Sequence, residues 1–168
     1  MWDRLLSHLQ IDAVDPYGLL LDVGILLVAF VIALPVGWDR ERSTRSMGLR
    51  TFPLVSVASA GFVLISKQVI GVGGPETARV LQGLMTGIGF LGGGAILKDE
   101  DRVRGSATAA SVWGTAGIGA AVAFGRLEIA LVLSGLSFAV LRFLRPVKEL
   151  ASEGAEADEA TGDAEART

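Results

Sequence analysis

Residues 16–38 read PYGLLLDVGILLVAFVIALPVGW, and this stretch decides the fold because Asp22 is the single charged side chain within it. At a rise of about 1.5 Å per residue, a helix of this length spans the roughly 30 Å hydrocarbon core of a bilayer. Four further apolar stretches follow at residues 53–72, 80–97, 107–124 and 127–144. These stretches lack the period-two alternation of a barrel strand. The sequence therefore predicts an all-α, polytopic membrane protein with five transmembrane helices.

The loops between the apolar stretches are alternately rich and poor in basic residues. Loops rich in Lys and Arg stay on the cytoplasmic side of a membrane. The alternation therefore predicts an N-terminus outside the cell and a cytoplasmic C-terminus. The basic loops contain Arg40, Arg42, Arg45 and Arg50 in the first case and Lys98, Arg102 and Arg104 in the second.

We divide the chain of 168 residues into three parts. Residues 1–15 form an N-terminal segment, which either lies on the outer membrane surface as a short helix or frays. Residues 16–148 form the transmembrane domain. Residues 149–168 form an acidic tail, and we expect this tail to be disordered because it is too polar to bury apolar surface. The chain has no cysteine, which excludes disulfides and thiolate chemistry.

Small residues predict how the helices pack. In lipid, helices associate through close backbone approach at small-xxx-small pairs, because leucine is no more apolar than the lipid around it. The stretch at residues 80–97 and the stretch that follows it both contain such pairs, so we expect these two helices to form the close-packed centre of the bundle. The expected packing positions are Gly83, Gly87, Gly89, Gly93, Ser111 and Gly114.

One string within this region resembles a nucleotide-binding motif. Residues 87–92, GIGFLG, match the G-x-G-x-x-G pattern of dinucleotide-binding folds. That motif requires a preceding strand, whereas this copy lies inside an apolar transmembrane run. We therefore reject a nucleotide site at this string. The sequence contains no metal motif, phosphate loop or catalytic constellation, so we expect no cofactor, and we expect no nucleic-acid partner.

The charged residues suggest two candidate sites. Asp22 lies about 9 Å into the first helix if that helix begins at Pro16. It is either an intramembrane cation or proton site that opens to the outer face, or a solvated interfacial carboxylate. At the basic end, acids and arginines alternate, and they form either a structural ion-pair layer or a site for a divalent cation or a partner. This expected charge cluster comprises Asp39, Arg40, Glu41, Arg50 and Arg104.

Four motifs resemble, in order, those of the MgtC/SapB family of bacterial inner-membrane proteins. They are GWDRE at 37–41, GLRT at 48–51, GIGFLGGG at 87–94 followed by ILK at 96–98, and VRG at 103–105 followed by TAASVW at 108–113. The resemblance covers about residues 17–145. It departs from the family at Asp39, where the family usually has Glu. The acidic tail is also too short for the folded cytoplasmic domain of well-known members.

The resemblance implies a multi-pass protein of the bacterial inner membrane that is linked to magnesium homeostasis. It implies a role in stress adaptation to scarce magnesium. The family is also virulence-associated, because its members in pathogens support survival inside host cells. It further implies regulation of other membrane proteins, with the ATP synthase and membrane transporters as partners besides the surrounding membrane lipid. Formation of a homo-oligomer stays open.

Two functions from different classes follow as hypotheses. The first is a non-enzymatic regulator that binds membrane proteins through its small-residue helix faces. The alternative is a transporter of Mg²⁺ or another cation, with Asp22, Asp39 and Glu41 on its path. The central stretches are nearly free of charge, which favours the regulator. An enzyme is disfavoured, because the sole histidine, His8, lies in the N-terminal segment and Ser111 has no base near it in sequence.

Overall fold

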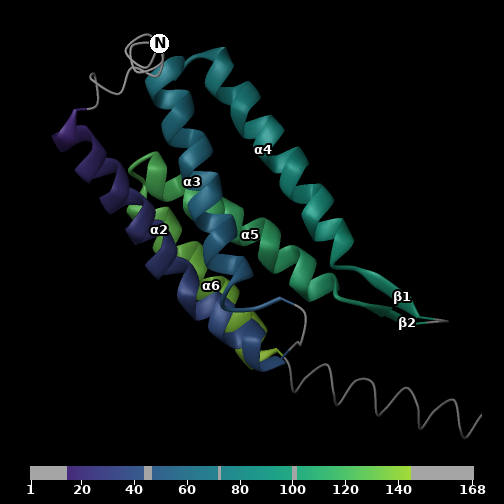
Figure 1. Cartoon of the computed structure of the whole chain (residues 1–168). Helices are drawn as coiled ribbons and strands as arrows, with labels where there is room; N and C mark the ends of the chain where they lie inside the picture. The colour runs from purple at the N-terminus through teal and green to yellow at the C-terminus, as the bar shows by residue number, and fades with distance from the viewer. Residues whose placement is uncertain (1–14, 44–46, 72, 100–101, 145–168) are drawn as a thin grey trace, which may run out of the picture.

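The computed structural model describes residues 15–43, 47–71, 73–99 and 102–144. This part of the chain forms five helices and one short antiparallel hairpin (Figure 1). The prediction of a helical protein with five long helices is confirmed, whereas the hairpin was not predicted. The elements are α2 (Pro16–Ser43), α3 (Thr51–Val69), α4 (Pro75–Gly94), β1 (Leu97–Asp99), β2 (Arg102–Arg104), α5 (Ser106–Ala123) and α6 (Leu127–Phe143). The N-terminal segment and the acidic tail predicted from the sequence lie outside the described residues, apart from Asp15.

Helix α2 begins where its sequence favours a start. The carboxylate of Asp15 accepts hydrogen bonds from the backbone N–H groups of Tyr17 and Gly18, at 3.1 and 2.9 Å. Pro16 occupies the first helical position, where its missing N–H costs nothing. The helix then runs for 28 residues, a rise of about 42 Å, and continues through Pro35. It therefore extends beyond the apolar run into the charged residues that follow.

Helix α5 occupies the centre of the bundle and packs against α2, α3, α4 and α6. Figure 1 shows α4 at the edge, diverging from α3 toward the end that carries the hairpin. The prediction of a two-helix centre is thus confirmed for α5 and wrong for α4. The hairpin connects α4 to α5. Gly105 follows the hairpin with a φ of +91° and lies directly against Ala95, so that a Cβ at this position would overlap the carbonyl oxygen of Ala95.

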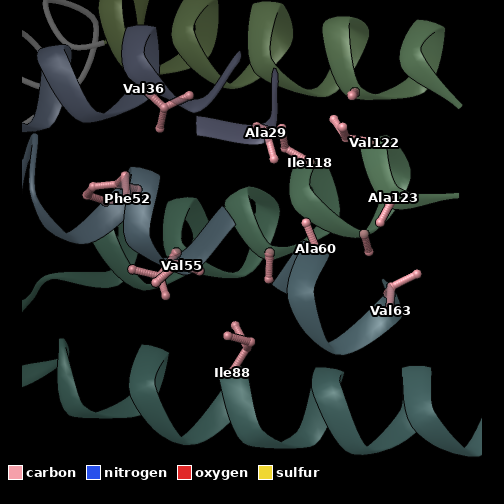
Figure 2. Close-up of a cluster of buried hydrophobic side chains, with 14 of the residues drawn as sticks. Ala29, Val36, Phe52, Val55, Ala60, Val63, Ile88, Ile118, Val122 and Ala123 are labelled. Atoms are coloured by element: carbon pink, nitrogen blue, oxygen red, sulfur yellow. The ribbon is translucent and has the colours of Figure 1, made fainter. Parts of the chain in front are cut away.

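The core lies where α2, α3 and α5 meet. Figure 2 shows Val36 of α2, Phe52 and Val63 of α3 and Ile118 of α5 in this cluster, with Ile88 of α4 on the opposite side of α3. Two buried hydroxyl groups bridge helices to the backbone of α2. Ser56 donates to the carbonyl oxygen of Ala29 at 2.9 Å, and Ser134 donates to that of Ile32 at 2.6 Å. Such interhelical hydrogen bonds hold helices together in lipid.

Two glycines that the sequence did not single out as packing positions lie against the backbone of a neighbouring helix. A Cβ on Gly119 of α5 would overlap the carbonyl oxygen of Ser56 on α3. A Cβ on Gly92 of α4 would lie 3.3 Å from the carbonyl oxygen of Ala109 on α5. These two glycines therefore allow the backbone of α5 to approach the backbones of α3 and α4 closely.

The predicted packing role of the α4 glycines is wrong within this chain. A Cβ added to any of these predicted glycines meets no atom within 4 Å, because α4 contacts its neighbours at other positions, such as Ile88 and Gly92. The exposed positions are Gly83, Gly87, Gly89 and Gly93. In α5, by contrast, a Cβ on Gly114 would make ordinary contact with Ser137 of α6 at 3.6 Å, and Ser111 is buried.

Two of the described helices, α2 and α3, are long and apolar enough by themselves to cross a membrane. Helix α6 has 17 residues, α5 is built largely from glycine, alanine, serine and threonine, which are only weakly apolar, and α4 combines six glycines with polar residues such as Arg79 and Gln82. The helices nevertheless present large apolar side chains on their outer surfaces. Leu20, Phe62, Phe90, Trp113 and Leu136, one from each helix, are all more than half exposed. Apolar surface spread over every helix indicates association with a membrane.

Candidate functional site

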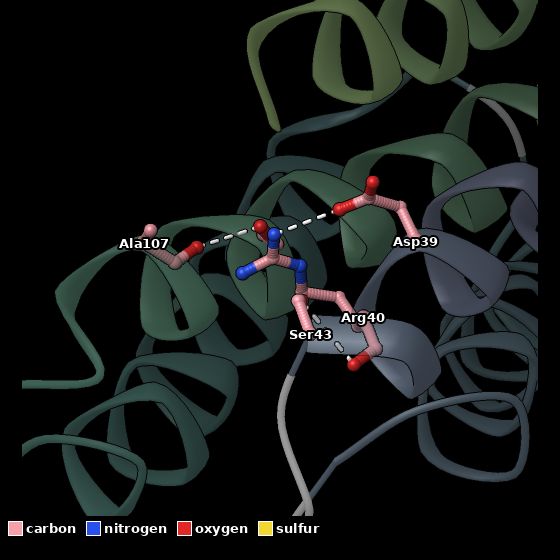
Figure 3. A network of polar contacts seen from close by, with 5 residues as sticks. Asp39, Arg40, Ser43 and Ala107 are labelled. Carbon is pink, nitrogen blue, oxygen red and sulfur yellow. Dashed lines mark hydrogen bonds and ion pairs between the residues drawn. The ribbon is translucent and has the colours of Figure 1, made fainter. Parts of the chain in front are cut away.

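The C-terminal end of α2 holds a buried ion pair. Arg40 donates from Nη2 to Oδ2 of Asp39 at 2.8 Å, and both residues are only 5% exposed. Figure 3 shows the guanidinium of Arg40 between Asp39 and the first turn of α5, where Ala107 lies. The pair is buried because α2 continues for more than a turn beyond Trp38 and places these residues against α5. The Asp39–Arg40 pair therefore lies at the junction of two helices.

This burial determines what the pair can do. Removing a charge from water is costly, and the cost is recovered only when an opposite charge and further hydrogen bonds accompany it. Arg40 supplies that charge to Asp39. A cation approaching Asp39 must compete with the guanidinium for the same carboxylate. The geometry therefore favours a structural role for the pair over a cation-binding one.

Glu41 braces the turn between α2 and α3. Its Oε2 atom accepts a hydrogen bond from the backbone N–H of Leu49 at 2.9 Å. Gly48 is required beside it, because a Cβ at that position would collide with the Glu41 carboxylate. The acid of the first motif and the glycine of the second thus lie in direct contact, although seven positions separate them in sequence.

Among the described side chains, Arg50 of the predicted charge cluster does not join this pair. Arg50 is exposed at the beginning of α3 and makes no hydrogen bond or ion pair with the described residues. Arg104 ends strand β2, and its side chain is outside the described part of the structure. Within the described side chains, the expected layer of acids and arginines therefore divides into a buried pair, an acid that stabilises a turn and an exposed arginine.

A second polar group lies at the opposite end of the bundle. Asp22 is half-buried and accepts a hydrogen bond from Nε2 of Gln68 at 2.7 Å, which joins α2 to α3. Lys67 donates to the carbonyl oxygen of Ala123 at 3.0 Å. Its positive charge is also stabilised there by the negative C-terminal end of the α5 dipole. Sequence reasoning missed Gln68, and its position beside Lys67 at the end of an apolar run was the available signal. Across residues 15–43, 47–71, 73–99 and 102–144, no group of three or more His, Asp or Glu side chains could hold a metal ion.

Ser111, a predicted packing residue, and its neighbour Thr115 both have hydrogen-bond partners within α5. Ser111 donates to the carbonyl oxygen of Ala107 at 2.6 Å, and Thr115 donates to that of Ser111 at 2.7 Å. Such bonds satisfy a buried hydroxyl without another helix. His8 lies outside the described residues.

Comparison with known proteins assigns the chain to a family. The profile of the MgtC family matches residues 26–150. Protein MgtC of Brucella suis is 38% identical over 122 residues, which cover 73% of this chain and 50% of that protein. Protein SrpB of Synechococcus elongatus is 36% identical over 119 residues, covering 64% of this chain and 65% of that protein. The "Putative magnesium transporter YhiD" of Escherichia coli is 32% identical over 122 residues, covering 69% and 57%.

This chain spans about half the length of the Brucella proteins that it matches. No solved structure matches it. The matched range contains the Asp39–Arg40 pair, Glu41 and the glycine-rich helix α4. The chain belongs to the MgtC family.

Proposed function

We propose that the chain is a multi-pass protein of the bacterial inner membrane, with five spanning helices, an external N-terminus and a cytoplasmic C-terminus. Two observations support this placement. Each described helix exposes large apolar side chains, which lipid would cover. The end of the bundle that contains Arg40, Arg42 and Arg50 is the more basic one, as expected for a cytoplasmic face.

We further propose that the protein acts in magnesium homeostasis as a non-enzymatic regulator of other membrane proteins. One observation carries this proposal: the acids that a cation path along α2 would use are already bonded within the bundle. Asp39 pairs with Arg40, and Asp22 accepts from Gln68. Gly89 and Gly93 of α4, which lie outside the α3–α4 groove and meet no atom within 4 Å, meanwhile leave a smooth surface on which the backbone of another membrane helix fits closely.

A transporter of Mg²⁺ or another cation is the second candidate. The name of the E. coli relative, "Putative magnesium transporter YhiD", favours it. So does the position of Asp22 and Asp39 near opposite ends of one helix, where they would mark the entrance and exit of a path along the bundle.

A growth experiment distinguishes the two candidates. A bacterial strain that lacks its own family member is grown in scarce magnesium while expressing the wild type, Asp22→Asn or Gly89→Leu. Asn keeps an oxygen that accepts from Gln68 but removes the charge, so the regulator should still support growth and the transporter should not. Leucine at Gly89 enters open space, so the bundle should fold while the outward face is blocked. The regulator should then lose function.

The same strains allow partners to be captured. Mild crosslinking in membranes followed by affinity purification should yield a membrane protein with the wild type and less of it with Gly89→Leu. The ATP synthase and membrane transporters are the first partners to look for. Growth lost with Asp22→Asn but kept with Gly89→Leu would overturn the regulator in favour of the transporter.

A further inference from the structure

A long groove separates α3 from α4, and its volume is about 760 Å³. It forms because the two helices diverge toward the hairpin end of the molecule (Figure 1). Its walls are apolar over most of their length. They include Leu54, Ala58 and Phe62 from α3 and Gly83, Gly87 and Leu91 from α4.

The shape of the groove follows from residue spacing. On α3 the lining side chains recur every four residues, so the wall follows one face of that helix. On α4 the facing positions include two glycines, and a Cβ on either would meet no atom within 4 Å. From Arg50 to Phe62 the groove follows α3 for about 18 Å, at a rise of about 1.5 Å per residue. One leaflet of the hydrocarbon core is about 15 Å deep.

One end of the groove carries a positive charge. Arg50 lines the groove where α3 begins, next to Thr51. The Arg50 side chain is exposed and makes no hydrogen bond or ion pair with the described residues. Guanidinium groups bind phosphate oxygens in a bidentate manner, so this end of the groove suits an anionic phosphate.

From this geometry we infer that the groove binds an anionic phospholipid, with an acyl chain between α3 and α4 and the headgroup phosphate on Arg50. A groove about one leaflet deep fits an acyl chain, whereas a docked helix would need an apolar face across the full membrane. An acyl chain is as well solvated by the bilayer as by an apolar groove, so apolar contact alone gives no preference between lipids. The groove therefore holds the acyl chain by its shape, and Arg50 selects the anionic headgroup. The inference rests on the proposed topology, which places Arg50 at the cytoplasmic leaflet.

The test uses the full chain in nanodiscs that contain phosphatidylglycerol mixed with phosphatidylcholine, and native mass spectrometry counts the lipid retained. The wild type should retain phosphatidylglycerol in preference to phosphatidylcholine. Arg50→Gln should lower that retention about fivefold, the equivalent of about 1 kcal/mol for one basic side chain near an anionic surface. Arg142→Gln, an exposed arginine at the same end of the bundle outside the groove, is the matched control and should change nothing.

Groove-filling variants test the acyl-chain part. Gly87→Leu should abolish retention, whereas Gly89→Leu, on the other face of α4, should preserve it. Gly83→Leu serves if Gly87→Leu does not fold, which circular dichroism reports. Equal retention of both lipids by the wild type, equal losses with Arg50→Gln and Arg142→Gln, or full retention by a folded groove-filling variant would each overturn the inference.

A second copy of the chain is the competing occupant. The natural chain has no cysteine, so Gly87→Cys provides a unique crosslinking site. A disulfide-linked dimer at this position in the same nanodiscs would place a second copy in the groove and overturn lipid binding. Lipid retention is measured without a growth assay. If the growth assay refutes the regulatory function, the lipid-retention result still stands. If lipid retention fails, the regulatory function is still tested independently by growth.

Discussion

Gly119→Ala is the substitution that most sharply tests the packing of the bundle. Gly119 lies where the backbone of α5 meets that of α3, and its Cβ would overlap the carbonyl oxygen of Ser56. Both groups belong to helix backbones, so a side-chain rotation cannot relieve the overlap. The two helices must separate to accommodate one methyl group.

The cost of that separation follows from the distances. The carbonyl carbon of Ser56 would lie 2.7 Å from the new Cβ, whereas carbon atoms in van der Waals contact stand about 3.5–4.0 Å apart. The helices must therefore part by about 1 Å, and a gap of that size forfeits a quarter to a half of the dispersion attraction across it. We expect Gly119→Ala to lower the free energy of unfolding by about 2–3 kcal/mol.

Gly87→Ala is the matched control, because a Cβ at Gly87 meets no atom within 4 Å. Alanine favours a helix over glycine by up to about 1 kcal/mol, so this variant should be as stable as the wild type or more stable. Titration of both variants from dodecyl maltoside into dodecyl sulfate, followed by circular dichroism, measures the difference. Wild-type stability of Gly119→Ala, or a larger loss for Gly87→Ala, would refute the packing described above.

Three further substitutions test polar contacts by the same titration. Asp39→Asn removes the buried carboxylate that Arg40 pairs with and should cost about 3–5 kcal/mol, with part of the loss restored in Asp39→Asn/Arg40→Gln. A loss below about 1 kcal/mol would contradict the contribution of this buried pair. Lys67→Met removes a charged hydrogen bond to the last turn of α5 and should cost about 1.5–3 kcal/mol, and an unchanged midpoint would argue against that bond. Ser56→Ala removes a bond to the α2 backbone and should cost about 1 kcal/mol, while a gain in stability would count against it.

The positions of the helices were largely predictable, because hydropathy marks the segments that lipid can surround. Hydropathy, however, shows where a segment leaves the lipid and does not show where its helix ends. The apolar run ends at Trp38, whereas α2 continues to Ser43. That extension buries Asp39 and Arg40 against α5, so the sequence predicted a charged site here but not its burial. Helix α4 likewise begins at Pro75, before its apolar run, because proline suits a first helical position.

The faces through which the helices pack could not be predicted from small-residue spacing alone. A glycine-rich helix presents small-residue pairs on more than one face, and its neighbours decide which face turns inward. In α4 the buried packing positions include Ile88 and Gly92, whereas the pair at 83/87 lines the groove toward α3 and the pair at 89/93 lies outside that groove. The contact of Gly119 with α3 depends on the central position of α5, which arises from interactions between helices distant in sequence.

Mg²⁺ entry into proteoliposomes tests the central functional proposal most directly. The purified full chain is reconstituted with an internal Mg²⁺-sensitive dye, beside empty vesicles and vesicles that contain an established Mg²⁺ channel. A regulator whose acids are bonded within the bundle should give no entry above empty vesicles while circular dichroism shows it folded. Entry above that level, abolished by Asp22→Asn, would contradict the proposal and make the protein a transporter.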